Sequence, residues 1–532
     1  MSERMFLLRT PHEVRSLSHG YPRTSQALRS ILHRIKTGTH PSAEDARTPE
    51  AEVPCLEAAI EAYESLKQKS DGSFTFWRDL MPCVWSWVCE EEILGGMSPA
   101  VSSGGAAGCW DGALGLVTKP GDRVEVSRKT CRAILANAFL LNLREADEDD
   151  TAGISEGAAS SPAPPRFGQL SFEATYILPR SSNGFPVGFH RLLCFLAYLD
   201  LAASFDAQQL EESVVIERYG PAAPQPAVSL SASALAFLSS PSTARASIGP
   251  AGGWGKVDAP VDVDAVRVTQ AAMEEPHAHC FVDFANRQIH IGRILGSLAT
   301  QEEILFSCCP ELYITLLNVS CMSDTEVVII RNVRRVSAYT GYLSTFTFSG
   351  FYKGSQLVTD VLALDATMSD HFNTSQIDRD MNKAYLGFKH AAHPHVVTTT
   401  QTQTQTDPSP PAETDAANGA PSLPSKAVIV TGRWGCGVFG GDKAFKFIQQ
   451  LCAATAASNV TLEYSTFHDA HTEKLFGELL SLMREHKVTV AEAYRWMCSF
   501  KGSLSRQPQA NFADYFKHMI VRTKGQKSCG CV

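Results

Sequence analysis

The sequence lacks the features that identify membrane proteins, secreted proteins and zinc-binding proteins. Its longest apolar stretches, residues 133–143 and 192–203, are too short or too interrupted to span a bilayer. The N-terminal residues include Glu3 and Glu13 and contain no continuous apolar segment of the kind found in signal peptides. No two pairs of cysteines have the spacing of a zinc site. We therefore expect no membrane anchor, no signal peptide, no bound metal and no cofactor.

An excess of positive charge is also absent, since the chain carries 47 Lys and Arg against 56 Asp and Glu, a formal net charge of −9. Proteins that bind duplex DNA are usually basic, so we expect no direct binding to duplex DNA. A local basic cleft for an anionic ligand is compatible with this net charge, because the potential near a cleft is set locally. The 15 cysteines fall mostly within apolar runs, which indicates buried thiols in a reducing compartment.

Composition divides the 532 residues into ordered parts and linkers. Segments rich in Pro, Ser, Ala and Gly predict exposed loops or disorder at residues 40–54, 146–166, 219–255 and 393–425. We expect a partly ordered N-terminal segment, then a helical accessory domain with loop insertions, then a C-terminal domain interrupted at about 393–425. These three parts cover residues 1–54, 55–261 and 262–532.

Hydrophobic periodicity predicts different secondary structure for the two larger parts. Apolar residues recur at three- and four-residue spacing in 79–88, 128–143 and 189–203, so this region is predicted to be helical. After residue 262, strand-like runs alternate with helical patterns, which predicts a layered α/β domain. Strands are expected at 280–284, 326–332, 357–364, 427–432 and 460–467. Helices are expected at 302–317, 377–388, 442–457, 472–486 and 489–500.

Thr300, Gln301, Glu302 and Glu303 open one of the predicted helices. Thr300 and Glu303 have the spacing of a capping box, in which the two side chains satisfy free backbone N–H groups of the first helical turn. The alternative interpretation is chemical. Two adjacent carboxylates at the edge of a cleft repel each other, so one of them can acquire a raised pKa and serve as a general acid. The residues alone favour the capping interpretation.

A glycine-rich loop, Gly432–Asp442, lies between the strand predicted at 427–432 and the helix predicted at 442–457. Glycines allow a ligand to approach the backbone closely, and N–H groups at a helix N-terminus bind phosphates. A tight turn that packs the helix on the strand is the alternative interpretation. The loop has neither the Lys-Ser/Thr of a nucleotide-hydrolase P-loop nor the spacing of a dinucleotide fingerprint.

Three arginines and two tyrosines lie at and after the end of a predicted strand: Arg331, Arg334, Arg335, Tyr339 and Tyr342. Guanidinium groups beside aromatic rings could bind phosphates and stack on a base. A solvated, charged loop is the default interpretation of the same residues.

Taken together and in order, these segments resemble the catalytic region of poly(ADP-ribose) glycohydrolases over roughly residues 74–500. Successive motifs of the family are similar to VDFANR at 282–287, QEE at 301–303, PEL at 310–312, YTGY at 339–342 and WGCGVFGGD at 434–442, and two of its helices are similar to LANAF at 135–139 and NKAY at 382–385. The resemblance implies a macrodomain-like layered mixed sheet with flanking helices, packed on an N-terminal helical accessory domain.

The resemblance also implies roles for individual residues. Glu303 would be the catalytic acid that acts at the leaving ribose oxygen, and Glu302 would hold ribose hydroxyls. Asn286 would be a further ribose contact. Tyr342 matches the aromatic residue that covers the ligand, and Phe467 is similar to the aromatic residue that packs on the terminal ribose.

Other residues are implied at the two remaining parts of the ligand. Gln301 and Asp283 would lie near the adenosine and distal-ribose end. The diphosphate would be held by the glycine loop, whose glycines are Gly435, Gly437, Gly440 and Gly441.

The chain departs from the family at one motif. The triple-glycine loop of the family falls within His290–Arg293, where Gly292 is the one glycine, so side chains would crowd a diphosphate approached by backbone N–H groups. Arg293 would instead add charge, and Arg433 stands where the family often has Asn. A catalytically inactive module that binds ADP-ribose polymer is therefore the alternative function.

The expected function is hydrolysis of the ribose–ribose O-glycosidic bonds of poly(ADP-ribose), which releases ADP-ribose through a Glu general acid/base and requires no metal. The expected partners are poly(ADP-ribose) and poly-ADP-ribosylated proteins, with no membrane, and we expect a monomer. The substrate points to the nucleus, the cytoplasm or both. Removal of ADP-ribose from protein side chains stays open as a side activity.

Overall fold

A computed structural model describes most of the chain, namely residues 6–8, 11–18, 20–38, 52–70, 72–90, 114–145, 170–221, 248–274, 278–291, 298–353, 358–392, 426–506 and 511–528. The insertion predicted at 393–425 and the loop predicted at 146–166 lie outside the described residues, as do residues 40–51 and 222–247 of the other two predicted linkers.

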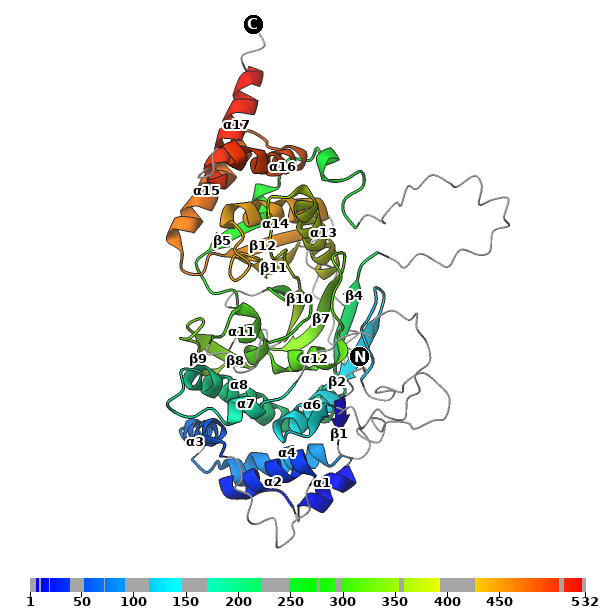
Figure 1. The fold of residues 1–532 in the computed structure, drawn as a ribbon, viewed down its shortest axis with the longest axis vertical. Coiled ribbons are helices and arrows are strands. Elements are labelled where there is room, and N and C mark those ends of the chain that lie inside the picture. Colours follow the sequence, from blue (N-terminus) through cyan, green and yellow to red (C-terminus); the bar gives the residue numbers. More distant parts are fainter. Residues whose placement is uncertain are drawn as a thin grey trace, which may run out of the picture.

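Helices form the N-terminal end of the molecule, drawn in blue to cyan in Figure 1. Helicity is confirmed in all three segments where it was predicted, although the second of these helices stops at Phe139. The elements are α1 (Pro11–Leu17), α2 (Ser25–Thr37), α3 (Pro54–Gln68), a π-helical turn (Phe76–Leu80), α4 (Met81–Val88), α6 (Arg128–Phe139), α7 (Glu173–Tyr176), α8 (Phe185–Ala203) and α9 (Ala207–Glu211). Strands β1 (Phe6–Leu8) and β3 (Leu143–Glu145) pair antiparallel beside them.

Helix α8 is central to this helical part. It begins seven residues before the apolar stretch at 192–203, and by length and composition it alone among the described helices could cross a membrane. In the protein 67% of this apolar segment is buried, as in the core helix of a globular domain. Its neighbours in space are α3 and the β-hairpin strand β9 (Thr347–Phe351).

The centre of the molecule is an eight-stranded mixed sheet in the order β2-β4-β7-β10-β6-β11-β12-β5. All five predicted strands are confirmed in it: β6 (Cys280–Asp283), β7 (Val327–Arg334), β10 (Val358–Ala363), β11 (Ala427–Thr431) and β12 (Val460–Ser465). Three further strands join it at its two edges: β2 (Arg123–Ser127), β4 (Ser213–Tyr219) and β5 (Val266–Thr269). The pairs from β10 through β6, β11 and β12 to β5 are parallel, whereas β2, β4, β7 and β10 pair antiparallel.

The helices of the C-terminal part pack on the sheet, and α17 lies at the far end of the molecule (Figure 1). They are α11 (Gln301–Cys308), a 3₁₀-helix (Pro310–Ile314), α12 (Thr315–Asn318), α13 (Thr374–Ala391), α14 (Lys443–Ala457), α15 (Ala470–Glu485), α16 (Val490–Arg506) and α17 (Phe512–Ser528). The prediction of one continuous helix over 302–317 was wrong. Proline at position 310 has no N–H group and clashes with the preceding turn, so α11 ends before it.

The sheet separates two hydrophobic cores because successive side chains of a strand point to opposite faces. Ile330 of β7 belongs to the core shared with the N-terminal helices, together with Leu196 of α8. Ile329 belongs to the core on the other face, together with Phe447 of α14. The layered α/β architecture expected from the sequence is therefore present.

The domain limits drawn from the sequence remain a prediction, but the sheet crosses the expected boundary at 261/262. Strands β2 and β4 lie before that boundary and pair with β7 of the C-terminal part. The first hydrophobic core likewise continues from Val14 to Ala363. The helical part and the sheet thus share one continuous apolar interior.

Candidate functional site

A cavity of about 400 Å³ opens beside the segments that follow the central parallel strands. Chain segments that leave β6, β10, β11 and β12 line it, which is the end of an α/β sheet where ligands usually bind. Most of the predicted site residues line this cavity: Asn286, Gln301, Glu302, Glu303, Tyr342, Gly435, Gly437 and Phe467. Asp283, Gly440 and Gly441 are not among the lining residues.

Thr300–Glu303 forms the predicted capping box, and it does so at the edge of the cavity. Glu303 closes a capping box, since its Oε2 accepts a hydrogen bond from the Thr300 backbone N–H at 2.9 Å and another from the Thr300 hydroxyl. The same first turn of α11 places Glu302 and Glu303 on the cavity wall with 3% and 6% of their surfaces exposed. The helix start therefore holds two carboxylates in a site that excludes most water.

Neighbouring groups compensate the carboxylates of Glu302 and Asp283 only in part. Glu302 Oε2 accepts a hydrogen bond from Asn286 Nδ2 at 3.1 Å, but Glu302 Oε1 and both carboxylate oxygens of Asp283 have no partner among the described residues. Burial raises the pKa of Glu302 well above its ordinary value, and the carboxylates of Asp283 and Glu303 raise it further. Burial and then Glu303 raise the pKa of Asp283 in the same way. The wall is thus suited to hold a proton or to bind hydroxyl groups.

Gln301 connects these carboxylates to Glu274, which was not predicted as a site residue. Its Oε1 accepts a hydrogen bond from the Phe284 backbone N–H at 2.8 Å, and its Nε2 lies 3.4 Å from Glu274 Oε1. Glu274 is 2% exposed, accepts a hydrogen bond from the Tyr339 hydroxyl, and has a pKa raised by burial. Glu274 falls in a short irregular segment without periodicity, so only the folded chain brings it to the cavity.

Two aromatic rings, from Tyr342 and Phe467, lie together at the cavity with their centres 5.2 Å apart. Tyr342 follows Gly341, whose φ of +78° and close approach to the Thr345 carbonyl leave no room for a side chain. Phe467 itself has a positive φ of +48°, and its N–H donates to Ser465 Oγ at 3.2 Å. A positive φ at a bulky residue is strained and is often found at functional sites.

The glycine loop also lines the cavity. The backbone N–H groups of Gly435, Gly437, Val438 and Phe439 have no acceptor within the described part of the chain, although all four residues line the cavity. Gly435 has a φ of +73°, and a Cβ there would lie 2.7 Å from the Ala366 Cβ, so only glycine fits. Free N–H groups ahead of a helix N-terminus favour an anion.

Two cations line the cavity beside this loop. Arg433 Nη2 lies 2.7 Å from Asp469 Oδ2, and Lys443 Nζ lies 2.9 Å from the same oxygen. Hydrogen bonds from the Thr472 backbone and hydroxyl, with help from Lys443, hold the pKa of Asp469 below its usual range. The two cations therefore share the carboxylate of Asp469.

The arginines at and after the end of the strand predicted at 326–332 do not line the cavity. Arg331, Arg334 and Arg335 are 3%, 8% and 6% exposed, so neither the phosphate-binding nor the solvated-loop interpretation is correct. β7 continues to Arg334 and carries them into the interior, where Arg331 binds Glu217 Oε2 at 2.6 Å. The two tyrosines of the same segment do line the cavity.

The altered triple-glycine motif is only partly described. His290 lines the cavity, whereas Gly292 and Arg293 lie outside the described residues. Within the residues that the structure places, no group of three or more His, Cys, Asp or Glu could hold a metal ion.

Comparison with known proteins agrees with the architecture. Residues 253–474 match the family model for poly(ADP-ribose) glycohydrolase with a macro domain fold, which confirms the macrodomain-like fold expected for this region. The chain is 25% identical over 275 residues to poly(ADP-ribose) glycohydrolase 2 of Caenorhabditis elegans, over 48% of this chain and 49% of the relative. It is 26% identical over 278 residues to a probable poly(ADP-ribose) glycohydrolase 2 of Arabidopsis thaliana, over 49% of this chain and 53% of the relative.

Among solved structures, poly(ADP-ribose) glycohydrolase from Deinococcus radiodurans in complex with ADP-ribose is similar at 16% identity and a TM-score of 0.25, over 43% of this chain and 82% of that chain. The chain spans about half the length of the curated relatives named above.

Proposed function

We propose that the protein, whose residues 253–474 match the family model for poly(ADP-ribose) glycohydrolase, hydrolyses ribose–ribose O-glycosidic bonds of poly(ADP-ribose) and releases ADP-ribose. The observation that carries the proposal is that two chemically unlike groups line one cavity. These are the carboxylates of Glu302 and Glu303 and the free N–H groups of Gly435 and Gly437. A ligand that carries both hydroxylated sugars and phosphates matches this combination.

Glu303 is the residue to which we assign the chemistry. As a general acid it would protonate the oxygen of the leaving ribose while the bond from that oxygen to the anomeric carbon breaks, leaving an oxocarbenium-like centre. The resulting Glu303 carboxylate would then remove a proton from water, whose oxygen bonds to the anomeric carbon. The proton count balances, because Glu303 ends the cycle protonated as it began.

One residue must serve in both steps because of its position. Glu302 and Glu303 are adjacent on a single helical turn, so they cannot flank a sugar as the separated carboxylates of most glycosidases do. We assign Glu302 to ribose hydroxyls, since one of its oxygens is held by Asn286 and the other has no protein partner. General acid–base catalysis of this kind contributes about 10²–10⁴-fold to the rate.

The remaining lining residues would position the substrate. The paired rings of Tyr342 and Phe467 offer an apolar surface for the ribose or the base, and the N–H groups of the glycine loop offer donors to the diphosphate. Arg433 and Lys443 add positive charge on the same side. Positioning in a water-poor cavity supplies much of the remaining acceleration in such enzymes.

The deciding experiment compares the wild type with Glu303→Gln on purified poly(ADP-ribose), with products identified by mass spectrometry. We expect free ADP-ribose from the wild type and a rate about 10²–10⁴-fold lower for the variant. Glu492→Gln is the matched control, because Glu492 makes the same contact with Thr489 at the start of α16 but does not line the cavity. A wild-type rate in Glu303→Gln would remove Glu303 from the mechanism.

The same two proteins distinguish the proposed enzyme from the alternative function, a binding module without activity. Polymer retained by the wild type, with no ADP-ribose released by either protein, would identify a reader of ADP-ribose polymer.

A further inference from the structure

The glycine loop rests on a lysine that is fully buried. Lys446, near the start of α14, is 0% exposed. A Cβ built on Gly435 would lie 3.2 Å from Lys446 Cε, and one built on Gly441 would lie 3.0 Å from the same atom. Lys446 Nζ also lies 5.2 Å from the centre of the Trp434 ring. The lysine side chain thus passes directly beneath both ends of the loop.

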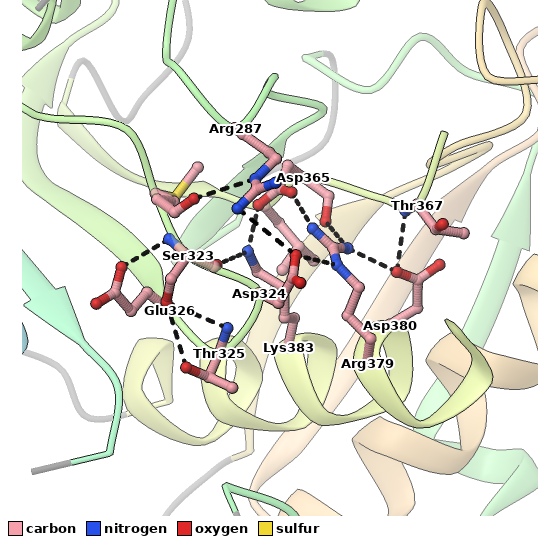
Figure 2. A network of polar contacts seen from close by, with 12 residues as sticks. Arg287, Ser323, Asp324, Thr325, Glu326, Asp365, Thr367, Arg379, Asp380 and Lys383 are labelled. Atoms are coloured by element: carbon pink, nitrogen blue, oxygen red, sulfur yellow. Dashed lines mark hydrogen bonds and ion pairs between the residues drawn. The ribbon is translucent and has the colours of Figure 1, made fainter. Parts of the chain in front are cut away.

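A buried carboxylate holds the ammonium group of this lysine. Asp380 of α13 is 0% exposed and forms an ion pair with Lys446 Nζ through Oδ2. Its other oxygen accepts hydrogen bonds from Arg379 Nη1 at 2.8 Å and from the Thr367 backbone N–H at 3.0 Å. Figure 2 shows Asp380 between Arg379 and Thr367. The position of Asp380 is therefore fixed from several sides, and it fixes Lys446 in turn.

Stability alone gives no reason to retain a buried ion pair. Removing two charges from water costs several kcal/mol per ion, and replacement of such pairs by apolar residues of similar volume is often neutral or stabilising by about 1–4 kcal/mol. Methionine would fill much of the volume of Lys446 without a charge. The pair joins α13 to α14 beside the glycine loop, so the position in which it holds Lys446 is the property to explain.

We propose that Lys446, held by Asp380, is a positioning residue for phosphate binding. It supports the loop in the conformation in which the N–H groups of Gly435 and Gly437 have no internal acceptor and are available to a diphosphate. The inference rests on the proposed function and deepens it, because it assigns part of the affinity for ADP-ribose to a pair of residues that do not line the cavity. A supporting residue of this kind acts through the groups that it holds.

The same network contains a matched control. Lys383 of α13 is also 0% exposed and forms an ion pair with Asp365, which is 1% exposed. Its Nζ donates to the Ser323 carbonyl at 2.9 Å, and Figure 2 shows it among these partners above α13. Lys383 has no contact with the glycine loop of the kind that Lys446 makes. The two lysines therefore separate support of the loop from general stability.

The test measures the dissociation constant of ADP-ribose by calorimetry for the wild type, Lys446→Met and Lys383→Met, together with the melting temperature of each. We expect Lys446→Met to raise the dissociation constant by about tenfold, the scale on which loss of a supporting residue weakens a binding site. Lys383→Met should keep the wild-type constant even where its melting temperature falls. With polymer as substrate, Lys446→Met should raise KM more than it lowers kcat.

Each result decides the matter. Equal constants for the wild type and Lys446→Met would overturn the inference while leaving the proposed function intact, and equal losses in both lysine variants would show a purely structural role. A wild type that does not bind ADP-ribose would overturn the proposed function and the inference together. If Lys446→Met does not fold, Lys446→Gln, which keeps a donor for Asp380, takes its place, and an unchanged constant in that variant would overturn the inference.

Discussion

Two groups of buried charges in this protein differ in whether they are paired. Around β7, Arg128 Nε lies 3.0 Å from Glu311 Oε1, and Arg331 binds both Glu217 and Asp360. Behind the cavity lining, beside Glu302 and Glu303, both carboxylate oxygens of Asp283 are buried without a hydrogen-bond partner among the described residues. The first group has its own counterions, and the second does not.

The difference identifies the carboxylates that no neighbouring group compensates. A buried charge is tolerated when a partner and further hydrogen bonds compensate it, as for Glu311, whose second oxygen accepts the Arg334 backbone N–H at 2.8 Å. An unpaired carboxylate is costly unless a ligand or a proton completes it. The sequence alone shows acids and arginines in both places, so only the pairing in the structure separates the compensated charges from the uncompensated ones.

The largest effect is expected from breaking a pair at β7. Arg128→Met leaves Glu311 buried without its cation, and the free energy of unfolding should fall by about 3–5 kcal/mol. Urea denaturation measures this fall. The control is Arg267→Met, since Arg267 also binds a carboxylate, that of Glu463 at 3.1 Å, but its side chain is 76% exposed. It should change stability by less than about 1 kcal/mol. Equal effects would contradict the comparison.

A smaller effect is expected at the unpaired donors of the glycine loop. Gly435→Ala places a Cβ 2.7 Å from the Ala366 Cβ in a backbone with a φ of +73°, so the loop must shift and its free N–H groups move. The dissociation constant of ADP-ribose should rise by about tenfold or more, because displacement of binding groups by about 1 Å can cost this much. Calorimetry with ADP-ribose checks the prediction.

The control for this change is Gly121→Ala, which has a φ of +93° but no heavy atom within 4 Å of the added Cβ, and which lies outside the cavity lining. It should lower stability by about 1–2 kcal/mol and leave the affinity unchanged. Unchanged affinity in both alanine variants would mean that the loop does not bind the ligand.

The smallest effect is expected from removing an unpaired charge. The pKa of Asp283 is raised in the folded protein by burial and by Glu303. As the pH rises above about 4, this carboxyl group therefore ionises in the unfolded protein before it ionises in the folded protein. The wild type therefore loses stability over this range relative to Asp283→Asn. At about pH 7 the variant should be more stable by on the order of 1 kcal/mol, and the difference should vanish near pH 4.

Melting temperatures measured between about pH 4.5 and pH 7.5 test this sign. Asp365→Asn is the control and should be less stable than the wild type at neutral pH, because Asp365 forms ion pairs with Arg379 and Lys383 that the amide weakens. A destabilised Asp283→Asn at neutral pH would show that this carboxylate has a partner in solution.

Prediction from sequence succeeded where the signal was local. The apolar runs of β6 and β11 and the glycines between β11 and α14 were identified because period and turn chemistry are written in consecutive residues. The end of the helix before Pro310 was missed, although a proline at this position predicts a helix break. Strands β2 and β4 were missed because their partners are distant along the chain, Ser213 for Ser127 and Arg331 for Val215, and because this region was predicted to be helical.

The sequence by itself determined the alternation of strands and helices, the capping box at Thr300–Glu303 and the glycines that allow a close backbone approach. Only the tertiary structure decided which charges are satisfied. Arg335 and Glu274 could each have been exposed or functional, and the packing of β7 buries the first while the chain turn before β6 brings the second to the cavity. The physical reason is that burial and pairing depend on neighbours distant in the sequence, whereas period, capping and turn geometry depend on adjacent ones.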